Sequence, residues 1–383
     1  MNLIALRMLT GDRAKYFGIL VGLAFASLLI TQQGAIFLGL ASRTYQFVAD
    51  TPQADLWVMD PQMQHHSDGK QMLETTLARV RGVEGVAWAV PMYRAFAQLR
   101  LPDGTLRTCL LNGVDDATLT GLPGDFAEGS PESLRHEAAV AVDLAAVAGK
   151  LSVSAPGGGS RPLMIGDQLE LNERRGVVSA VYRQRPGFFW DPTLYTTFSR
   201  AKQFSPGTRR QLTFVLVKVR DGASVAHVQR SIAGVTGMAC RTSDQFAWKT
   251  AVYILTQTGI LINFAIAVLL GFMVGAAIAG QTFYNFVNDN LRYFAALKAI
   301  GASDRRLAGM VAVQALTAAA CGYGLGAGAA AFFGHAVGEG LAFFLPWHLL
   351  VFGAVSVVGI AAVSAVIGIR KLKALEPATV FKS

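Results

Sequence analysis

The sequence predicts an α-helical integral membrane protein that has four transmembrane helices and a large α+β domain between helix 1 and helix 2. Three observations predict this class. Of the 383 residues, 52% are hydrophobic and only 15% are charged, whereas soluble domains carry about 25% charged residues. Long apolar runs lie toward both ends of the chain. A mixed, charge-rich block at 41–250 separates the first run from the others.

Four apolar segments are long enough to cross the hydrocarbon core, which takes about 20 residues of helix. We predict transmembrane helices at 16–40, 251–280, 307–333 and 348–369. The connecting segments are 1–15, the domain at 41–250, a loop at 281–306, a short loop at 334–347 and a tail at 370–383. Several glycines predict close contact between these helices, namely Gly271, Gly275, Gly280, Gly322, Gly324, Gly326 and Gly328.

Segment 1–15 begins with an amphipathic stretch, LIALRML at 3–9, which predicts a helix in the membrane interface. A plain first turn of the following span explains the same pattern equally well.

The basic residues outside the block indicate how the chain is oriented. They lie in the N-terminal segment, the 281–306 loop and the tail, and comprise Arg7, Arg13, Lys15, Arg292, Lys298, Arg305, Arg306, Arg370, Lys371, Lys373 and Lys382. The 334–347 loop has no Lys or Arg and carries Glu339. Because cytoplasmic loops are enriched in Lys and Arg, we expect both termini in the cytosol and the block outside. The net charge of +9 therefore reflects topology and does not indicate nucleic-acid binding.

The block at 41–250 alternates between strand and helix patterns. Strands are predicted at 54–60, 86–100, 105–114, 211–220 and 238–241, a hairpin at 169–183, and helices at 70–81 and 224–234. We expect the first and last thirds to pack together, with a β-rich middle third that carries a mobile loop at 157–159. A helix from Ser243 toward the second span, with its first breaker at Gly259, predicts a stalk.

No motif for catalysis or metal binding occurs in the chain. The Walker A pattern GxxxxGK[ST] is missing, as are HExxH, GxSxG and CxxC. We therefore predict no catalytic residue, no metal site and no cofactor on this chain. The adjacent His65 and His66 are interpreted as a solvated loop.

Cysteines and uncharged polar residues leave two questions open. A disulfide between Cys109 and Cys240 is one alternative and two free thiols the other, since both lie in the block. Four polar residues near the outer half of the first two spans either form interhelical hydrogen bonds or line a substrate path: Gln32, Gln33, Gln257 and Asn263. No charged residue falls inside a predicted span, which disfavours a proton relay.

Residues 292–306, RYFAALKAIGASDRR, resemble the signature after the second span of MacB/FtsX-type ABC permeases. The stretches LIALRML, ADLWVMDP and RKLKALEPATVF add a resemblance to the DevC-like branch, the stand-alone permease of a tripartite exporter. The resemblance implies a MacB-type exported domain and a bacterial inner-membrane homodimer. It also implies two copies of a cytosolic ABC ATPase, which carries ATP and Mg, with a periplasmic adaptor and an outer-membrane channel. The cargo would be amphipathic: a lipid, glycolipid, hydrophobic drug or haem-like molecule.

The same loop predicts a short helix at 290–300 that ends at Gly301, with its apolar residues near one side. An apolar face below the membrane suits docking into a groove of an ATPase. The predicted coupling residues are Arg292, Phe294, Leu297, Lys298, Ile300 and Gly301. The cations among them serve equally well as anchors at the lipid surface.

Three functions are compatible with these features. The first is an export permease, and the second is an ABC-coupled regulator of an extracellular hydrolase or sensor, as in FtsX. The third is a receptor or scaffold that works without an ATPase.

Overall fold

A computed structural model describes residues 2–154, 159–185, 187–188, 191–205, 211–338 and 341–373. The chain divides into two compact units. One, here called the helical unit, joins Met1–Leu40 to Thr258–Ser383, and the other, the sheet unit, is Ala41–Gln257. Glu339, Pro377 and Phe381 lie outside the described residues, as does most of the loop predicted at 157–159.

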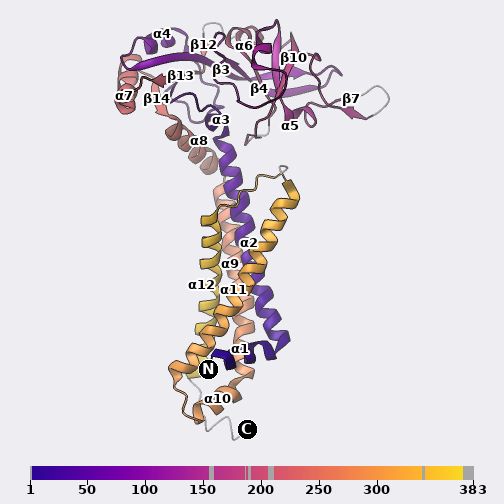
Figure 1. Cartoon of the computed structure of the whole chain (residues 1–383), viewed down its shortest axis with the longest axis vertical. Helices are drawn as coiled ribbons and strands as arrows, with labels where there is room; N and C mark the ends of the chain where they lie inside the picture. The colour runs from indigo at the N-terminus through magenta and orange to yellow at the C-terminus, as the bar shows by residue number, and fades with distance from the viewer. Residues whose placement is uncertain are drawn as a thin grey trace. The chain divides into compact units, whose positions relative to one another are not determined.

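The described part of the helical unit contains four helices that are long and apolar enough to span a membrane. They are α2 (Arg13–Thr44), α9 (Ile260–Asp289), α11 (Asp304–Val337) and α12 (Trp347–Lys373), and they run side by side in Figure 1. The prediction of four apolar spans is confirmed. Two short helices complete the unit: α1 (Asn2–Gly11) and α10 (Leu291–Ala299).

Glycines bring α9 and α11 close to α2. A Cβ on Gly326 would lie 2.3 Å from the Ala24 carbonyl oxygen, and a Cβ on Gly275 would lie 2.3 Å from the Ala26 Cβ. Only glycine permits these approaches. The predicted contact role is wrong for Gly324 and Gly328, which have open space around them.

Helix α1 packs on α11 along one side. Its Ala5 and Leu9 are buried, whereas Leu3 and Ile4 are exposed. The side-chain Nε2 of the buried Gln314 donates a hydrogen bond to the Ala5 carbonyl at 2.8 Å. The amphipathic pattern at 3–9 therefore corresponds to a separate helix with a buried and an exposed side.

The second predicted span is displaced along the chain. Helix α8 (Ser243–Gln257) ends before the span begins, and Gly259, with φ +68°, precedes α9. The prediction of a span at 251–280 is wrong at its start, because 251–257 belong to α8 of the sheet unit. Gly259 is the helix breaker that the sequence indicated, since glycine adopts positive φ at little cost.

The sheet unit is built on one ten-stranded sheet with the order β14-β1-β13-β3-β4-β11-β6-β10-β5, and β9 pairs with β10 and β3. Pairs β4–β11 and β6–β10 are parallel. The strands are β1 (Leu56–Met59), β2 (Met72–Leu73), β3 (Val86–Arg100), β4 (Leu106–Val114), β5 (Phe126–Glu128), β6 (Ala139–Asp143), β7 (Val153–Ser154), β8 (Ser160–Arg161), β9 (Gln168–Leu171), β10 (Arg174–Tyr182), β11 (Thr193–Thr197), β12 (Gln211–Leu212), β13 (Phe214–Val219) and β14 (Ala239–Thr242).

The first and last thirds of the block pack together, as predicted, through β1, β3, β13 and β14. The middle third is β-rich, as predicted, and its strands extend the same sheet beyond β4. The helix predicted at 70–81 is shorter, since residues 72–73 form β2 and only Thr75–Arg81 are helical.

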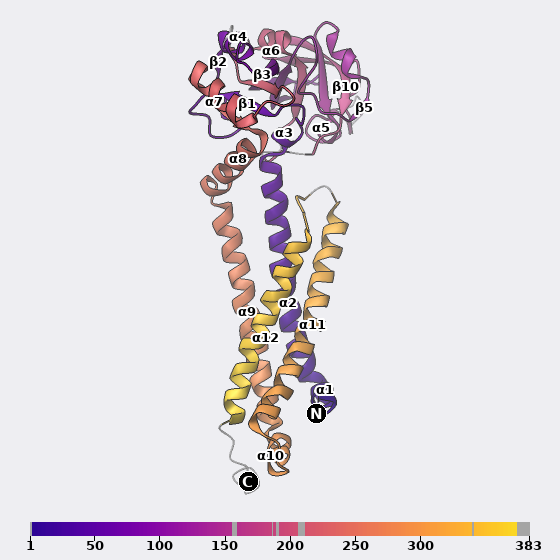
Figure 2. The same cartoon turned by 60° about the vertical axis from the view of Figure 1, so that its left-hand side comes forward.

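Helices cover both faces of the sheet (Figure 2). One core contains residues of α4 (Thr75–Arg81), α6 (Phe198–Phe204) and α7 (Val225–Thr236), and the other contains residues of α3 (Gln46–Ala49) and α8. Successive residues of β1 alternate between these cores, because side chains alternate across a strand. The alternation gives β1 a buried residue at every position, including Trp57.

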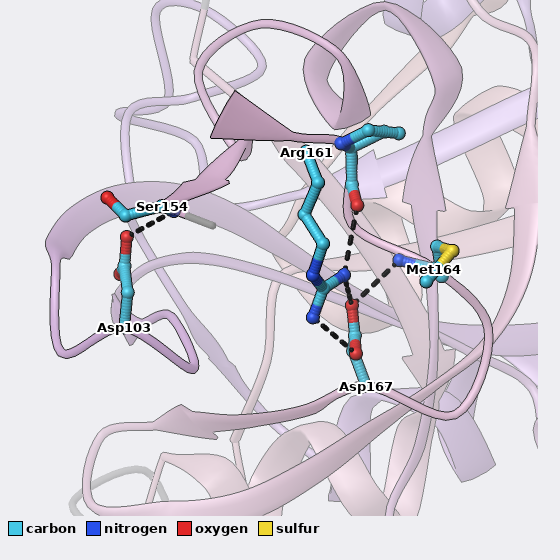
Figure 3. Close-up of polar contacts among 6 residues, drawn as sticks. Asp103, Ser154, Arg161, Met164 and Asp167 are labelled. Carbon is cyan, nitrogen blue, oxygen red and sulfur yellow. Dashed lines mark hydrogen bonds and ion pairs between the residues drawn. The ribbon is translucent and has the colours of Figure 1, made fainter. Parts of the chain in front are cut away.

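Strands β7 and β8 form a small hairpin that polar contacts attach to the domain (Figure 3). The Asp103 carboxylate accepts the Ser154 N–H at 2.9 Å, and hydrogen bonds from the Ser154 and Thr105 amides hold the pKa of Asp103 far below its usual range. The Arg161 guanidinium pairs with both oxygens of Asp167 at 2.7 and 3.0 Å. These contacts secure the described base of the hairpin.

Candidate functional site

The segment that joins α9 to α11 contains the predicted coupling residues. Helix α9 ends at Asp289, α10 spans Leu291–Ala299, and α11 begins at Asp304. The turn after α10 is a Schellman motif, in which Ala302 N–H donates to Leu297 O and Gly301 N–H donates to Lys298 O, each at 3.0 Å. Gly301 has φ +100°, a conformation that favours glycine. The predicted helix and its glycine stop are confirmed.

The apolar side of α10 faces the helical unit. Phe294 and Ala295 are fully buried in a cluster with Phe286 and Val287, and Leu297 is partly buried there. The prediction that this side is free to dock into another protein is wrong, because the chain's own helices cover it. Phe294 and Leu297 therefore hold α10 on the bundle.

The other side of α10 is exposed. Tyr293 is 64% exposed and Ile300 is 85% exposed. Arg292, which precedes Tyr293 in the sequence, is also exposed. The Lys298 Nζ pairs with Asp304 at 2.9 Å and links α10 to the first turn of α11. Sequence reasoning missed Tyr293, although its place one and two positions before the buried Phe294 and Ala295 turns it away from the side that they share.

A second polar contact at this end of the helical unit joins α2 to α9. The Lys15 Nζ pairs with Asp12 at 2.8 Å and also with Asp289. The start of α2 and the end of α9 therefore lie at the same end of the bundle as α10. Burial of Phe286 and Val287 beneath α10 fits this arrangement.

The four residues of the predicted substrate path are divided between the units. Gln32 and Gln33 are half-buried on α2, and Asn263 is exposed on the first turn of α9. The Phe37 and Phe264 rings lie 5.6 Å apart, which brings this part of α2 beside that turn. Gln257 is exposed at the end of α8, in the sheet unit. The substrate path stays a prediction.

Cys109 and Cys240 are free and buried. They lie on β4 and β14, four strand spacings apart, which is about 19 Å at about 4.8 Å each. A disulfide requires Cα atoms within about 7 Å, so the disulfide alternative is wrong. Burial raises the pKa of both thiols to about 12. Cys321, which falls within the third predicted span, is exposed on α11.

The interpretation of the histidine pair as a solvated loop is wrong for His66, which is buried. Its Nε2 donates to the Thr44 carbonyl at 2.9 Å, which fixes Nδ1 as the acceptor in the neutral ring. Burial and the nearby Arg94 hold the pKa of His66 well below its usual value. His65 stacks on Tyr253 of α8, with ring centroids 5.4 Å apart.

Within the described residues, no group of three or more His, Cys, Asp or Glu side chains could hold a metal ion. At this end of the helical unit, Lys15 pairs with Asp12 and Asp289, and Lys298 pairs with Asp304. The exposed side of α10 therefore provides a contact surface, which consists of the Tyr293 ring, the Ile300 side chain and the Arg292 guanidinium.

Two protein-family models match this chain, one in each half. Residues 17–235 match the MacB-like periplasmic core domain, and residues 252–377 match the FtsX-like permease C-terminal region. No curated protein matches the chain significantly.

Solved structures similar to this chain cover about half of it. The extracellular domain of the noncanonic ABC-type transporter YknZ from Gram-positive bacteria is 18% identical, with a TM-score of 0.36 over 49% of this chain and 98% of that one. The periplasmic region of MacB from Actinobacillus actinomycetemcomitans is 12% identical, with a TM-score of 0.37 over 51% and 92%. A domain of a putative permease from Porphyromonas gingivalis is 16% identical, with a TM-score of 0.31 over 46% and 80%.

Proposed function

This chain belongs to the family of MacB/FtsX-type ABC permeases, and from that premise we propose that it is the permease subunit of an ATP-driven exporter. It is a multi-pass membrane protein, and members of its family work with a cytosolic ABC ATPase. We propose that a homodimer of this chain sits in the bacterial cytoplasmic membrane with both termini in the cytosol. The cargo would be amphipathic, and a periplasmic adaptor and outer-membrane channel would complete the DevC-like assembly.

The observation that carries this proposal is the exposed side of α10. Tyr293 and Ile300 are large apolar side chains exposed at the basic end of the helical unit, and Arg292 lies beside Tyr293. Aromatic residues and arginine are enriched where a few side chains dominate the energy of a protein interface. Phe294, the Schellman turn and the Lys298–Asp304 pair hold these side chains on the bundle.

We propose different roles for the coupling residues. Arg292, Tyr293 and Ile300 contact the ATPase, whereas Phe294, Leu297, Lys298 and Gly301 position the helix. ATP-driven movement of the ATPase then reaches α9 and α11, because α10 is attached to both by short connections. In this proposal the movement passes from α9 to α8, which belongs to the sheet unit, and the sheet unit then carries out the export step.

The experiment is affinity purification of the tagged full chain from its host membrane, followed by mass spectrometry. We expect an ABC ATPase at stoichiometric level with the wild type. Ile300→Asp places a charge on an 85% exposed side chain, so it should spare folding and lower the recovered ATPase about tenfold or more.

The matched control is Leu73→Asp, which charges a side chain that is 64% exposed in the sheet unit. We expect this variant to recover as much ATPase as the wild type. Equal recovery with Ile300→Asp would contradict the role of α10, and no ATPase with the wild type would contradict the proposal. An ATPase recovered without adaptor or channel would instead favour the non-transporting regulator.

A further inference from the structure

A groove with a volume of about 390 Å³ lies in the sheet unit between α4 and α6. Both helices pack on the same face of the sheet (Figure 2). The buried Pro91 of β3 and Leu212 of β12 form its floor, and Phe198 forms the wall on the side of α6. Small-molecule sites have volumes of about 300–1,000 Å³. The groove is therefore large enough to hold a small ligand.

One face of α4 forms the other wall. Glu74, Leu77, Ala78 and Arg81 line the groove, and they follow the spacing i, i+3, i+4 and i+7 of a single helix face. From Glu74 to Arg81 this wall is about 10 Å long, at about 1.5 Å per residue. Its middle is apolar and its charged side chains lie at the two ends. A ligand that fits this groove is therefore amphipathic.

The two charged ends differ in how they are paired. Glu74 forms an ion pair with Lys202 of α6, which joins the two helices and neutralises the carboxylate. Arg81 Nε donates to the Ala89 carbonyl at 2.8 Å, which fixes the guanidinium at its end of the groove. Within the part of the chain that the structure describes, no carboxylate forms an ion pair with Arg81. The Nη donors of Arg81 and its positive charge therefore remain for a ligand.

These features define the chemistry of the ligand. The apolar middle favours an aliphatic chain, because a peptide backbone placed there would leave N–H and C=O groups without partners. The guanidinium favours a carboxylate, which can accept two parallel hydrogen bonds from it. A monoanion also matches the single unpaired cation, whereas a phosphate monoester carries a charge of about −1.5 to −2 at pH 7.

We propose that this groove binds a single-chain aliphatic carboxylate. The carboxylate accepts from the Nη atoms of Arg81, and the chain lies over Leu212 between Leu77 and Phe198. In the proposed exporter this ligand is the amphipathic cargo, and in that respect the inference rests on the proposed function. Binding itself needs neither ATP nor the ATPase. Failure to bind would therefore leave the exporter proposal standing, and a missing ATPase would leave the binding site standing.

The test is photo-crosslinking of the purified full chain in phosphatidylcholine nanodiscs, with octanoate that carries a diazirine on its chain. Mass spectrometry of the digested protein locates the label. We expect saturable labelling of peptides from 74–81 and 198–204, whereas labelling of the spans through the lipid should not saturate. Excess octanoate should compete for the groove, and octanol and octylammonium, which lack an anionic head, should not. Absence of saturable labelling in these peptides, or equal competition by octanol, would overturn the proposal.

Two variants locate the site. Arg81→Gln removes the cation and should raise the octanoate concentration for half-maximal labelling about tenfold or more. Ala78→Trp fills the groove from an exposed position and should abolish the saturable labelling. The matched controls are Arg230→Gln, which removes an exposed arginine whose Nε also donates to a backbone carbonyl, and Thr75→Trp, which adds the same ring to α4 outside the groove lining. Both controls should label like the wild type. Wild-type labelling in either groove variant would contradict the site.

Discussion

At the scale of single residues, burial decides which groups of the sheet unit carry charge. Asp143 lies at the end of β6 and caps α5 (Leu144–Val147) by accepting the Ala145 N–H. Burial raises the pKa of its carboxyl to about 6, above the ordinary 3.8. Because the folded pKa is the higher one, the folded state favours the protonated form. This contribution to stability is present below about pH 4 and is lost as the pH rises through 6.

Asp143→Asn removes this dependence and keeps a side-chain oxygen that can cap α5. We expect the variant to be more stable than the wild type at pH 7.5, by about 1–3 kcal/mol for a shift of about two pKa units. The advantage should narrow at pH 5. Thermal unfolding of both proteins at the two pH values measures the difference, and an equal gap at both would contradict the assigned cause.

The burial of His66 and its contact with Arg94 could not be predicted from the sequence. A histidine pair in a polar stretch is ordinarily solvated, and nothing local distinguishes His66 from such a residue. Its burial depends on Thr44, 22 residues earlier, and on Arg94, 28 residues later. Such contacts form only when the sheet is assembled. Burial of Cys109 and Cys240 on separated strands is likewise set by strand order, which residue spacing does not reveal.

At the scale of elements, local patterns were more informative. The apolar runs predicted the four long helices, and alternation of side chains predicted β3 with the observed bounds, 86–100. Gly301 predicted the end of α10, because a Schellman turn needs positive φ there. The apolar stripe on α10 was recognised, but its partner was wrongly assigned, because an amphipathic pattern does not say which surface covers it. Here the chain's own α9 residues do so.

The packing of α11 on α2 depends on which of its glycines face that helix. Gly326→Ala should lower the unfolding temperature by several degrees, because the new Cβ would lie 2.3 Å from the Ala24 carbonyl and the helices would have to separate. Gly328→Ala is the matched control, since it adds the same methyl group to the same helix in open space. It should leave the unfolding temperature unchanged or raise it. Equal losses in both variants would show that the contact with Ala24 is not the cause, since both substitutions gain the same helix propensity.

At the scale of the whole molecule, the charges of the helical unit predict how it lies in the membrane. Arg7, Arg13, Lys15 and the cations of 292–306 lie near the ends of helices that are joined by the Lys15–Asp289 pair. One end of the bundle is therefore basic. Because positive residues are retained in the cytosol, we propose that α10 and the N-terminus lie inside. An even number of spans then puts the tail on the same side and the sheet unit outside.

Cysteine labelling in whole cells tests this topology. Cys109 and Cys240 are buried, so Cys321→Ala gives a chain with no exposed native thiol among its described residues. In that background, Glu132→Cys introduces a thiol on the surface of the sheet unit, and Ala299→Cys introduces one on α10; both positions are exposed. With a membrane-impermeant maleimide, we expect the thiol at 132 to react in intact cells, after the outer membrane is permeabilised where one is present.

The thiol at 299 should react only after the cytoplasmic membrane is opened. Each variant is the control for the other, since both must react fully in lysed cells. The opposite pattern would invert the topology and place α10 where no cytosolic ATPase reaches it. The exporter and the ABC-coupled regulator would then both be excluded, because each needs α10 in the cytosol. If only the thiol at 132 reacts in intact cells, α10 lies in the cytosol, where ATP is hydrolysed. Coupling through Tyr293 and Ile300 requires this location.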